Sequence, residues 1–333
     1  MTAILAASGT GAVPQRQAAP APRATLLVVN QKDATLSIVD PETKQVVAKI
    51  DQGTSNRVHA HEVAVSRDGR SAFLPIYSDV ALGKPGIDGH QMLAVDLPSR
   101  LIAWTLDFGS GVRPHLPVVD PVSGLLYVTT ERKNAVTVID PARRRILGTI
   151  PTGAEQSHML ALSHDGRFGY TANVAPGSVS VLDLKRRKTL AVIPVAGGVQ
   201  RIAVSTDDRW LFTADTQQNR LAVIDARKHL VDHWITLPGM GYGAAAMRDG
   251  RHLLVALPLA DQVAVIDLVQ GKVVRTIAVG TLPQEILIRP DGRTAYVSCG
   301  RNDTVTVLDL DRWEASATIA TGPAPDGLAW AGR

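Results

Sequence analysis

One apolar segment recurs seven times along the chain, each time as a short run rich in Val, Ile, Leu and Ala that ends in aspartate. The seven aspartates are Asp40, Asp96, Asp140, Asp183, Asp225, Asp267 and Asp309. Their spacings are 56, 44, 43, 42, 42 and 42 residues. A fixed period of about 40–45 residues built on strand-like segments is typical of a β-propeller, in which each repeat forms one blade. The pattern therefore predicts seven blades.

Residues 283–321 show the predicted plan of one blade. Four strands are expected, at Glu285–Arg289, Thr294–Ser298, Thr304–Leu308 and Ala315–Ala320. Pro290-Asp291-Gly292 is a tight turn between the first two strands, with glycine supplying the positive φ that such turns need. The strands alternate only partly between apolar and polar residues, because both faces of a blade pack against neighbouring blades.

The two ends of the repeat array predict how the ring closes. The first apolar strand, Leu26–Val29, corresponds to the second strand of a blade, and the last, Gly327–Trp330, corresponds to a first strand. We expect these segments to pair, which leaves no free sheet edge. The prediction is an all-β fold, a seven-bladed β-propeller of four-stranded antiparallel blades over residues 24–333, after a flexible leader or signal remnant at residues 1–23.

The second strands of several repeats carry a further motif, which reads LYVTT at 126–130, GYTAN at 169–173 and AYVS at 295–298. With the Pro-Asp-Gly-like turn before it and the Asp-ended strand after it, this pattern resembles the YVTN-repeat β-propeller proteins. The resemblance extends over nearly all of residues 24–333 and implies the fold. Members of this group include envelope and surface-layer proteins, lactonase-like enzymes and propellers that hold haem d1, so function must be argued from the site.

Composition narrows the class of protein. The formal net charge is +4, and the single cysteine, Cys299, excludes an internal disulfide. No apolar run has the 18 or so residues needed to span a bilayer. The basic runs Arg143–Arg145 and Lys185–Lys188 follow strand-ending aspartates, so we interpret them as solvated turns, and the small number of aromatic residues argues against nucleic-acid binding. The Ala- and Pro-rich residues 1–23 favour a periplasmic or secreted protein, with a cytoplasmic location as the alternative.

The repeats differ most at the entry to the innermost strand. Aligned there, the seven blades carry His61, His115, His158, Gln200, Tyr242, Gln284 and Asp326. Three consecutive blades therefore present histidine at one equivalent position, near the mouth of the central channel. Neutral imidazole is the commonest metal ligand, and three converging imidazoles leave an open coordination position. We predict a metal site formed by His61, His115 and His158 with Gln200; the alternative is that each histidine caps a loop carbonyl.

Several neighbouring residues could carry out chemistry at such a site. Glu62 and Glu285 could serve as general bases, and Tyr242 lies at the same level of the channel, so these three are the predicted catalytic residues. The cofactor would be a divalent transition metal; imidazole binds Zn, Fe, Mn, Ni and Cu, and the sequence does not distinguish them. A metal in an open site can polarise a carbonyl or activate a bound water.

The second repeat is longer than the others, and the extra residues predict a substrate-binding region. They fall in the approach to His59 and in the segment Tyr77–His90, which we expect to join the blade's second and third strands on the histidine face. The predicted substrate-binding residues are His59, Arg57, Arg113, Arg201, Tyr77 and His90. The alternatives are a tolerated surface insertion and, for the arginines, ion pairs with Glu62, Glu155 and Glu285.

Two functions from different classes follow. The first is a metal-dependent small-molecule enzyme, a lyase or hydrolase, with its site at the channel mouth. The second is a non-catalytic scaffold propeller of the bacterial envelope that holds a protein, a glycan or a haem-like ligand on its loop face. The expected partner is a small molecule in the central funnel, and a protein partner remains open.

Overall fold

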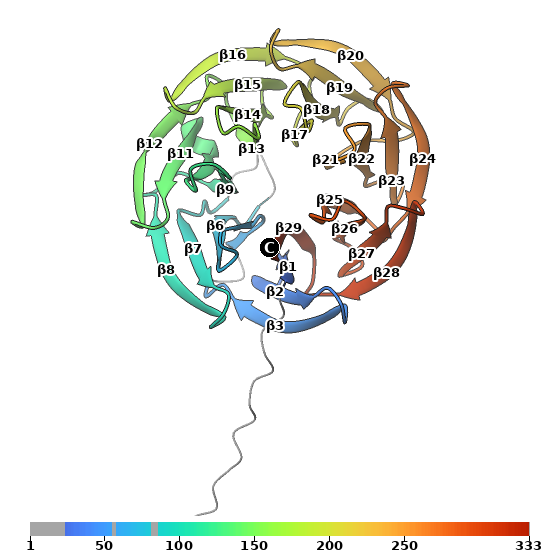
Figure 1. Ribbon diagram of the computed structural model, residues 1–333. Helices are drawn as coiled ribbons and strands as arrows, with labels where there is room; N and C mark the ends of the chain where they lie inside the picture. The colour runs from blue at the N-terminus through green and yellow to red at the C-terminus, as the bar shows by residue number, and fades with distance from the viewer. Residues whose placement is uncertain (1–23, 55–57, 81–85, 333) are drawn as a thin grey trace, which may run out of the picture.

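The computed structural model describes residues 24–54, 58–80 and 86–332, and they form a ring of seven β-sheets around a central axis (Figure 1). Every sheet is antiparallel and has its first strand nearest the axis and its last strand at the outer edge. The predicted fold is confirmed. The leader predicted at residues 1–23 lies outside the described residues, as does Arg57.

The strand bounds are as follows. From the inner to the outer strand, blades 1 to 3 are β29 (Pro325–Gly332), β1 (Ala24–Asn30), β2 (Thr35–Asp40), β3 (Gln45–Asp51); β4 (His59–Ala60) and β5 (Ala64–Val65), β6 (Ser71–Ser78), β7 (Gln91–Asp96), β8 (Leu101–Asp107); and β9 (Pro114–Val119), β10 (Leu126–Thr130), β11 (Ala135–Asp140), β12 (Arg145–Pro151). Blades 4 and 5 are β13 (Ser157–Leu162), β14 (Phe168–Asn173), β15 (Ser178–Asp183), β16 (Lys188–Pro194); and β17 (Ala203–Val204), β18 (Trp210–Asp215), β19 (Arg220–Asp225), β20 (Leu230–Thr236). Blades 6 and 7 are β21 (Ala244–Ala246), β22 (His252–Leu257), β23 (Gln262–Asp267), β24 (Lys272–Ala278); and β25 (Pro283–Ile288), β26 (Thr294–Cys299), β27 (Thr304–Asp309), β28 (Glu314–Ala320).

Each of the seven repeated aspartates ends the third strand of its blade, and all seven make the same kind of hydrogen bond. In every blade the side-chain oxygen accepts a hydrogen bond from a backbone N–H two or three residues later, in the turn to the outer strand. For example, Asp40 Oδ1 accepts from the N–H of Glu42 at 2.9 Å. An aspartate that satisfies the N–H groups of its own turn fixes the hairpin locally. The aspartate repeat, which is the strongest pattern in the sequence, therefore reflects the fold and not a functional site.

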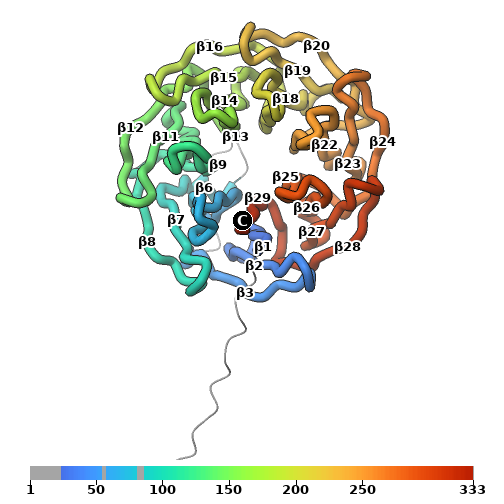
Figure 2. The backbone as a smooth tube through the Cα atoms, in the orientation of Figure 1, coloured from blue at the N-terminus to red at the C-terminus, as the bar shows by residue number. Residues whose placement is uncertain are grey.

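The two ends of the described chain close the ring. Strand β29 pairs antiparallel with β1, with Leu26 opposite Trp330 and Val28 opposite Leu328. Figure 2 shows the two strands side by side in blade 1. This confirms the pairing predicted from Leu26–Val29 and Gly327–Trp330, and it joins the first and last repeats into one blade.

The inner strands are less regular than the others. In blade 2 the inner strand is split into β4 and β5, both paired with β6, which leaves residues 61–63 between two short ladders. Blade 3 ends its second strand in a short 3-10 helix, η1 (Glu131–Lys133). Within the described residues no helix is long and apolar enough to cross a membrane. The split inner strand of blade 2 and the helix η1 of blade 3 both lie at the candidate site described below.

A close backbone approach at Gly177 makes the turn between β14 and β15 sensitive to substitution. Gly177 has φ +63°, and a Cβ placed there would lie 1.8 Å from the carbonyl oxygen of Ala196. We expect Gly177→Ala to lower the free energy of unfolding by about 2–3 kcal/mol, since left-handed strain and a backbone clash add. The matched control is Gly271→Ala, which has the same φ but open space around the Cβ and should cost only about 1 kcal/mol. Urea-induced unfolding of both variants measures the difference, and equal losses would contradict the close approach.

Candidate functional site

A cavity of about 470 Å³ opens at the centre of the ring, where the loops between blades meet. Its walls come from residues in blades 1, 2, 4, 5, 6 and 7, namely Gln31, His59, His61, Tyr77, Asp79, Val80, His158, Gln200, Tyr242, Gln284 and Asp326. Histidine and tyrosine from blades 2 and 4 form one side, and amide and carboxylate side chains form the other. The volume is typical of a small-molecule site.

The predicted histidines do come together on one side of this cavity. We call His59, His61, His115 and His158 the imidazole cluster. The ring centroids of His61 and His115 are 5.7 Å apart, and those of His115 and His158 are 3.8 Å apart. Tyr77 lies among them, with its ring centroid 4.7 Å from that of His61 and 4.5 Å from that of His115. Equivalent positions in adjacent blades are thus neighbours in space.

The orientation of the rings does not match the tripod predicted for a metal ion. His115 and His158 are stacked, with 22° between their planes, and His59 and His61 are stacked at 17°. Stacked imidazoles present their faces to each other, so their nitrogens do not point at one centre. Among the described residues no group of three His, Cys, Asp or Glu side chains is arranged to hold a metal ion. The four-ligand site of His61, His115, His158 and Gln200 therefore stays a prediction without geometric support.

Burial keeps several of these imidazoles neutral. It lowers the pKa of His61 and of His115 well below the ordinary 6.5, and the neighbouring histidines lower both further. Burial also lowers the pKa of His59, with partial opposition from the carboxylate of Asp79. A neutral imidazole keeps a lone pair on one nitrogen. These side chains are therefore in the state that a metal or an acidic hydrogen-bond donor requires.

Behind the cluster lies a buried carboxylate, Glu131, at the start of η1. It accepts a hydrogen bond from the hydroxyl of Tyr77 at 2.6 Å, and its Oε2 lies 3.8 Å from Nδ1 of His158. Burial and the charge of Glu131 raise the pKa of Tyr77, so the phenol keeps its proton. His158 is 7 % exposed, and its Nδ1 has no hydrogen-bond partner. A carboxylate behind an imidazole that lines a cavity resembles the outer support of metal-bound histidine.

On the opposite side of the cavity, Arg201 lies behind the lining residues Asp326 and Tyr242 and is 8 % exposed. Its guanidinium donates to Glu62 Oε1 at 3.0 Å and to Asp326 Oδ1 at 3.1 Å, and Glu285 Oε2 lies 3.8 Å away. We call these four residues the Arg201 cluster. The guanidinium carbon also lies 5.1 Å from the ring centroid of Tyr242. An arginine of blade 5 therefore ties together carboxylates of blades 1, 2 and 7.

The Arg201 cluster contains three carboxyl groups and one cation. Burial raises the pKa of Glu62 well above its usual value, and the charge of Glu285 adds to this. Burial likewise raises the pKa of Glu285 and of Asp326, while the charge of Arg201 opposes both shifts. These groups are already committed to one another, and Glu62 is 1 % exposed. The catalytic role predicted for Glu62, Glu285 and Tyr242 stays a prediction.

The predicted substrate-binding residues separate into two groups. His59 and Tyr77 line the cavity. Arg113 is fully buried and bonded to Asp88, Arg201 belongs to its own cluster, and His90 lies 46 % exposed with its Nδ1 2.9 Å from Asp107. None of these last three lines the cavity, and each is paired with at least one carboxylate. The segment Tyr77–His90 does join the second and third strands, β6 and β7, as expected; its residues 81–85 lie outside the described part.

Sequence reasoning missed Gln31 and Glu131, and it placed Asp79 near the mouth only through the insertion. Gln31, Asp79 and Glu131 each come directly after the second strand of their blade, in blades 1, 2 and 3. The corresponding residues in blades 4 to 7 are Val174, Thr216, Pro258 and Gly300. An alignment at this second position, beside the one at the inner strand, would have found the three.

Comparisons with known proteins agree with this architecture. The sequence profile of the cytochrome D1 heme domain family matches residues 122–236, which include His158, Gln200 and Arg201. No curated protein matches the sequence. Hydrazine synthase of Kuenenia stuttgartiensis is similar in structure, with a TM-score of 0.70 and 20 % identity over 84 % of this chain and 92 % of that one.

Dihydro-heme d1 dehydrogenase NirN, solved in complex with DHE, gives a TM-score of 0.66 at 16 % identity, over 95 % of this chain and 77 % of that one. At these identities the structural likeness shows the propeller fold alone. The profile match covers about a third of the chain, so it shows a similarity to that family over this part and assigns no activity. Membership of the YVTN-repeat group stays a resemblance.

Proposed function

We propose that the central cavity binds a haem-type iron tetrapyrrole, with His158 as the protein ligand to the iron. The observation that carries the proposal is the imidazole of His158 on the cavity wall, backed by the buried carboxylate of Glu131 at 3.8 Å from its Nδ1. Metal-bound histidines commonly face such a carboxylate through their second nitrogen. The heme-domain profile match includes this residue and Glu131, which supports iron over the other metals considered.

The other side chains that line the cavity match part of the polar edge of such a ligand. Gln31, Gln200 and Gln284 supply amide donors, and Tyr242 supplies a hydroxyl. The described lining contains Asp79 and Asp326 and neither lysine nor arginine, so ligand carboxylates would be bound by neutral donors. When bound, an iron tetrapyrrole supplies one-electron redox or small-ligand chemistry. The chain's own residues would bind and orient it. Tyr77 would keep its phenolic proton and donate it in the hydrogen bond to Glu131.

Two sequence-based interpretations fare differently under this proposal. The ligand-binding propeller of the envelope is retained, with a periplasmic or secreted location as part of the proposal. A metal-dependent lyase or hydrolase is not supported, since Glu62 and Glu285 are bound within the Arg201 cluster. The transition metal expected from the sequence, which that analysis left undetermined among Zn, Fe, Mn, Ni and Cu, is narrowed in this proposal to iron, and the expected small-molecule partner is kept.

The test is a titration of the purified ligand-free chain with haemin, followed by absorbance in the Soret region. We expect saturation at about one haemin per chain and a spectrum of histidine-ligated iron. Elemental analysis of the same preparation, before and after soaking in Zn, Mn, Ni and Cu salts, tests the free-ion site predicted from the sequence. Non-saturable haemin uptake, or a stoichiometric free ion that blocks haemin, would reject the proposal.

A further inference from the structure

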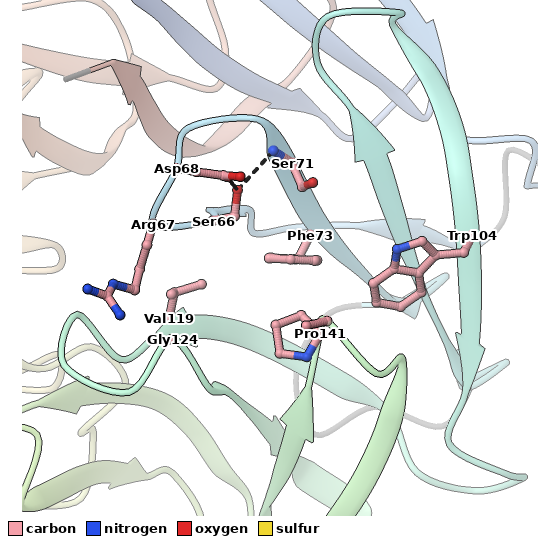
Figure 3. Close-up of a pocket in the computed structure, with 10 residues that line it drawn as sticks. Ser66, Arg67, Asp68, Ser71, Phe73, Trp104, Val119, Gly124 and Pro141 are labelled. Atoms are coloured by element: carbon pink, nitrogen blue, oxygen red, sulfur yellow. Dashed lines mark hydrogen bonds between the residues drawn. The ribbon is translucent and has the colours of Figure 1, made fainter.

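A second cavity, of about 480 Å³, lies between blades 2 and 3 at the end of the ring opposite the imidazole cluster (Figure 3). Its apolar floor includes Phe73, half-buried Trp104, Val119 and Pro141. Figure 3 shows the rings of Phe73, Trp104 and Pro141 around one hollow, with the guanidinium of Arg67 at its rim. We call this the blade 2–3 groove. It is large enough for one apolar side chain and part of the segment that carries it.

The groove borders a strongly basic surface. Pro141 begins the turn that continues as Arg143-Arg144-Arg145, and the matching turn of blade 4 contains Lys185–Lys188. All seven of these basic residues are exposed; the side chains of Arg143 and Arg186 are 71 % and 74 % exposed. Residues 141–151 and 184–194, which form these turns and the outer strands after them, contain no Asp or Glu. We call the seven residues the basic rim.

The structure joins the groove and the rim into one surface. The guanidinium carbon of Arg144 lies 5.9 Å from the ring centroid of Trp104, in the groove. The guanidinium of Arg187 donates to the carbonyl of Leu147 on β12 at 2.7 Å, so the blade 4 turn lies against blade 3. These contacts leave part of each guanidinium free while restricting its motion. Arginine positioned in this way loses less entropy when it binds a carboxylate.

The acidic residue in the groove lining, Asp68, forms no ion pair with the basic rim among the ion pairs of the described residues. Asp68 accepts hydrogen bonds within its own turn, from Ser66 Oγ at 2.6 Å and from the N–H of Arg70 at 3.1 Å. Asp140 and Asp183 are buried below the rim, each holding a single arginine of its turn. Five of the seven rim charges are therefore without a carboxylate partner among the ion pairs of the described residues.

We infer that the blade 2–3 groove and the basic rim together bind an acidic segment of a partner protein, which inserts one apolar side chain beside Trp104. Charge complementarity selects the acidic partner. The apolar side chains exposed among the basic ones, Ile146, Leu190 and Val192, are each about 40 % exposed and do not protrude as membrane anchors do. Arginine with a shallow apolar floor is typical of a protein interface, so we favour a protein segment over an anionic lipid surface.

The test uses the full chain and a fluorescein-labelled acidic peptide of eight residues with one central phenylalanine. Fluorescence anisotropy should show saturable binding that weakens as salt is raised. Changing Arg143, Arg144 and Arg145 to Glu should weaken binding at least about tenfold, and Trp104→Ala should weaken it several-fold. A peptide with serine in place of phenylalanine should lose the dependence on Trp104.

The matched control reverses three exposed charges on blades 6 and 7, in the variant Lys272→Glu, Arg301→Glu, Arg312→Glu. It has the same net charge as the rim variant and should bind the peptide within about twofold of wild type. Equal loss in both variants would show a non-specific effect of net charge and overturn the inference. Sedimentation with phosphatidylglycerol vesicles that depends on the rim, without peptide binding, would overturn it in favour of a membrane. Both variants should keep haemin binding, so the two proposals fail independently.

Discussion

Replacing Arg201 with methionine is expected to lower the free energy of unfolding by about 3–5 kcal/mol, because it removes the single cation from a buried group of three carboxyls. Methionine fills much of the same space, so the loss reflects charge more than volume. Glu62 would keep only Glu285 and Asp326 as charged neighbours within the cluster. Urea-induced unfolding at pH 7 measures the effect. Adding Glu62→Gln to the variant should recover part of the loss.

The free energy of unfolding should depend on pH in a direction that follows from the carboxyl groups, whereas a loss of packing alone would not depend on pH. Glu62, Glu285 and Asp326 have raised pKa values in the folded protein, and without Arg201 those values rise further. Between the ordinary carboxyl pKa of about 4 and the raised folded values, the folded state binds more protons than the unfolded state. Stability therefore falls as pH rises through this window. The deficit of Arg201→Met against wild type should be smallest near pH 5 and largest at neutral pH.

Arg293→Met is the control, since the Arg293 side chain is 75 % exposed and lies 3.7 Å from Asp311. Surface pairs of this kind contribute about 0–1 kcal/mol. If Arg201→Met costs no more than Arg293→Met, or if its deficit grows as pH falls, the buried carboxylates are not held by this arginine.

His158→Ala is expected to weaken haemin binding at least about tenfold and to remove the spectrum of histidine-ligated iron, because the alanine side chain cannot coordinate. Glu131→Gln should weaken binding less, since it removes the charge behind the imidazole and leaves the ligand in place. Absorbance titrations of the two variants against wild type measure both effects. Free imidazole added to His158→Ala should restore the histidine-type spectrum, which a merely structural defect would not allow.

His233→Ala provides the matched control, because His233 lies on the outer strand β20 with its side chain 46 % exposed. It should bind haemin as wild type does. A wild-type spectrum in His158→Ala would assign the iron to another member of the imidazole cluster, His59 or His61, or to none of them. If His59 or His61 held the iron, the same titration on His59→Ala and His61→Ala would show which of the two it is.

The blade architecture could be derived from the sequence because its determinants are local. Each repeated aspartate binds N–H groups two or three residues away, so the period of the turns is written directly in the chain. The strands of the last blade were predicted within one or two residues, and the pairing of Leu26–Val29 with Gly327–Trp330 followed from counting strands. The meeting of His61, His115 and His158 also followed, because equivalent positions of adjacent blades converge on one axis.

The tertiary structure alone decided what those side chains face. Arg201 reaches Glu62 and Asp326, which are 139 and 125 residues away in sequence, and no repeat pattern encodes a contact across the channel. Whether imidazoles stack or converge depends on their side-chain torsions, which the packing of Tyr77 among them influences. The burial of Arg113 against Asp88 likewise depends on a loop outside the repeat. Local hydrogen bonds repeat with the sequence, whereas contacts across the axis arise only once the ring has closed.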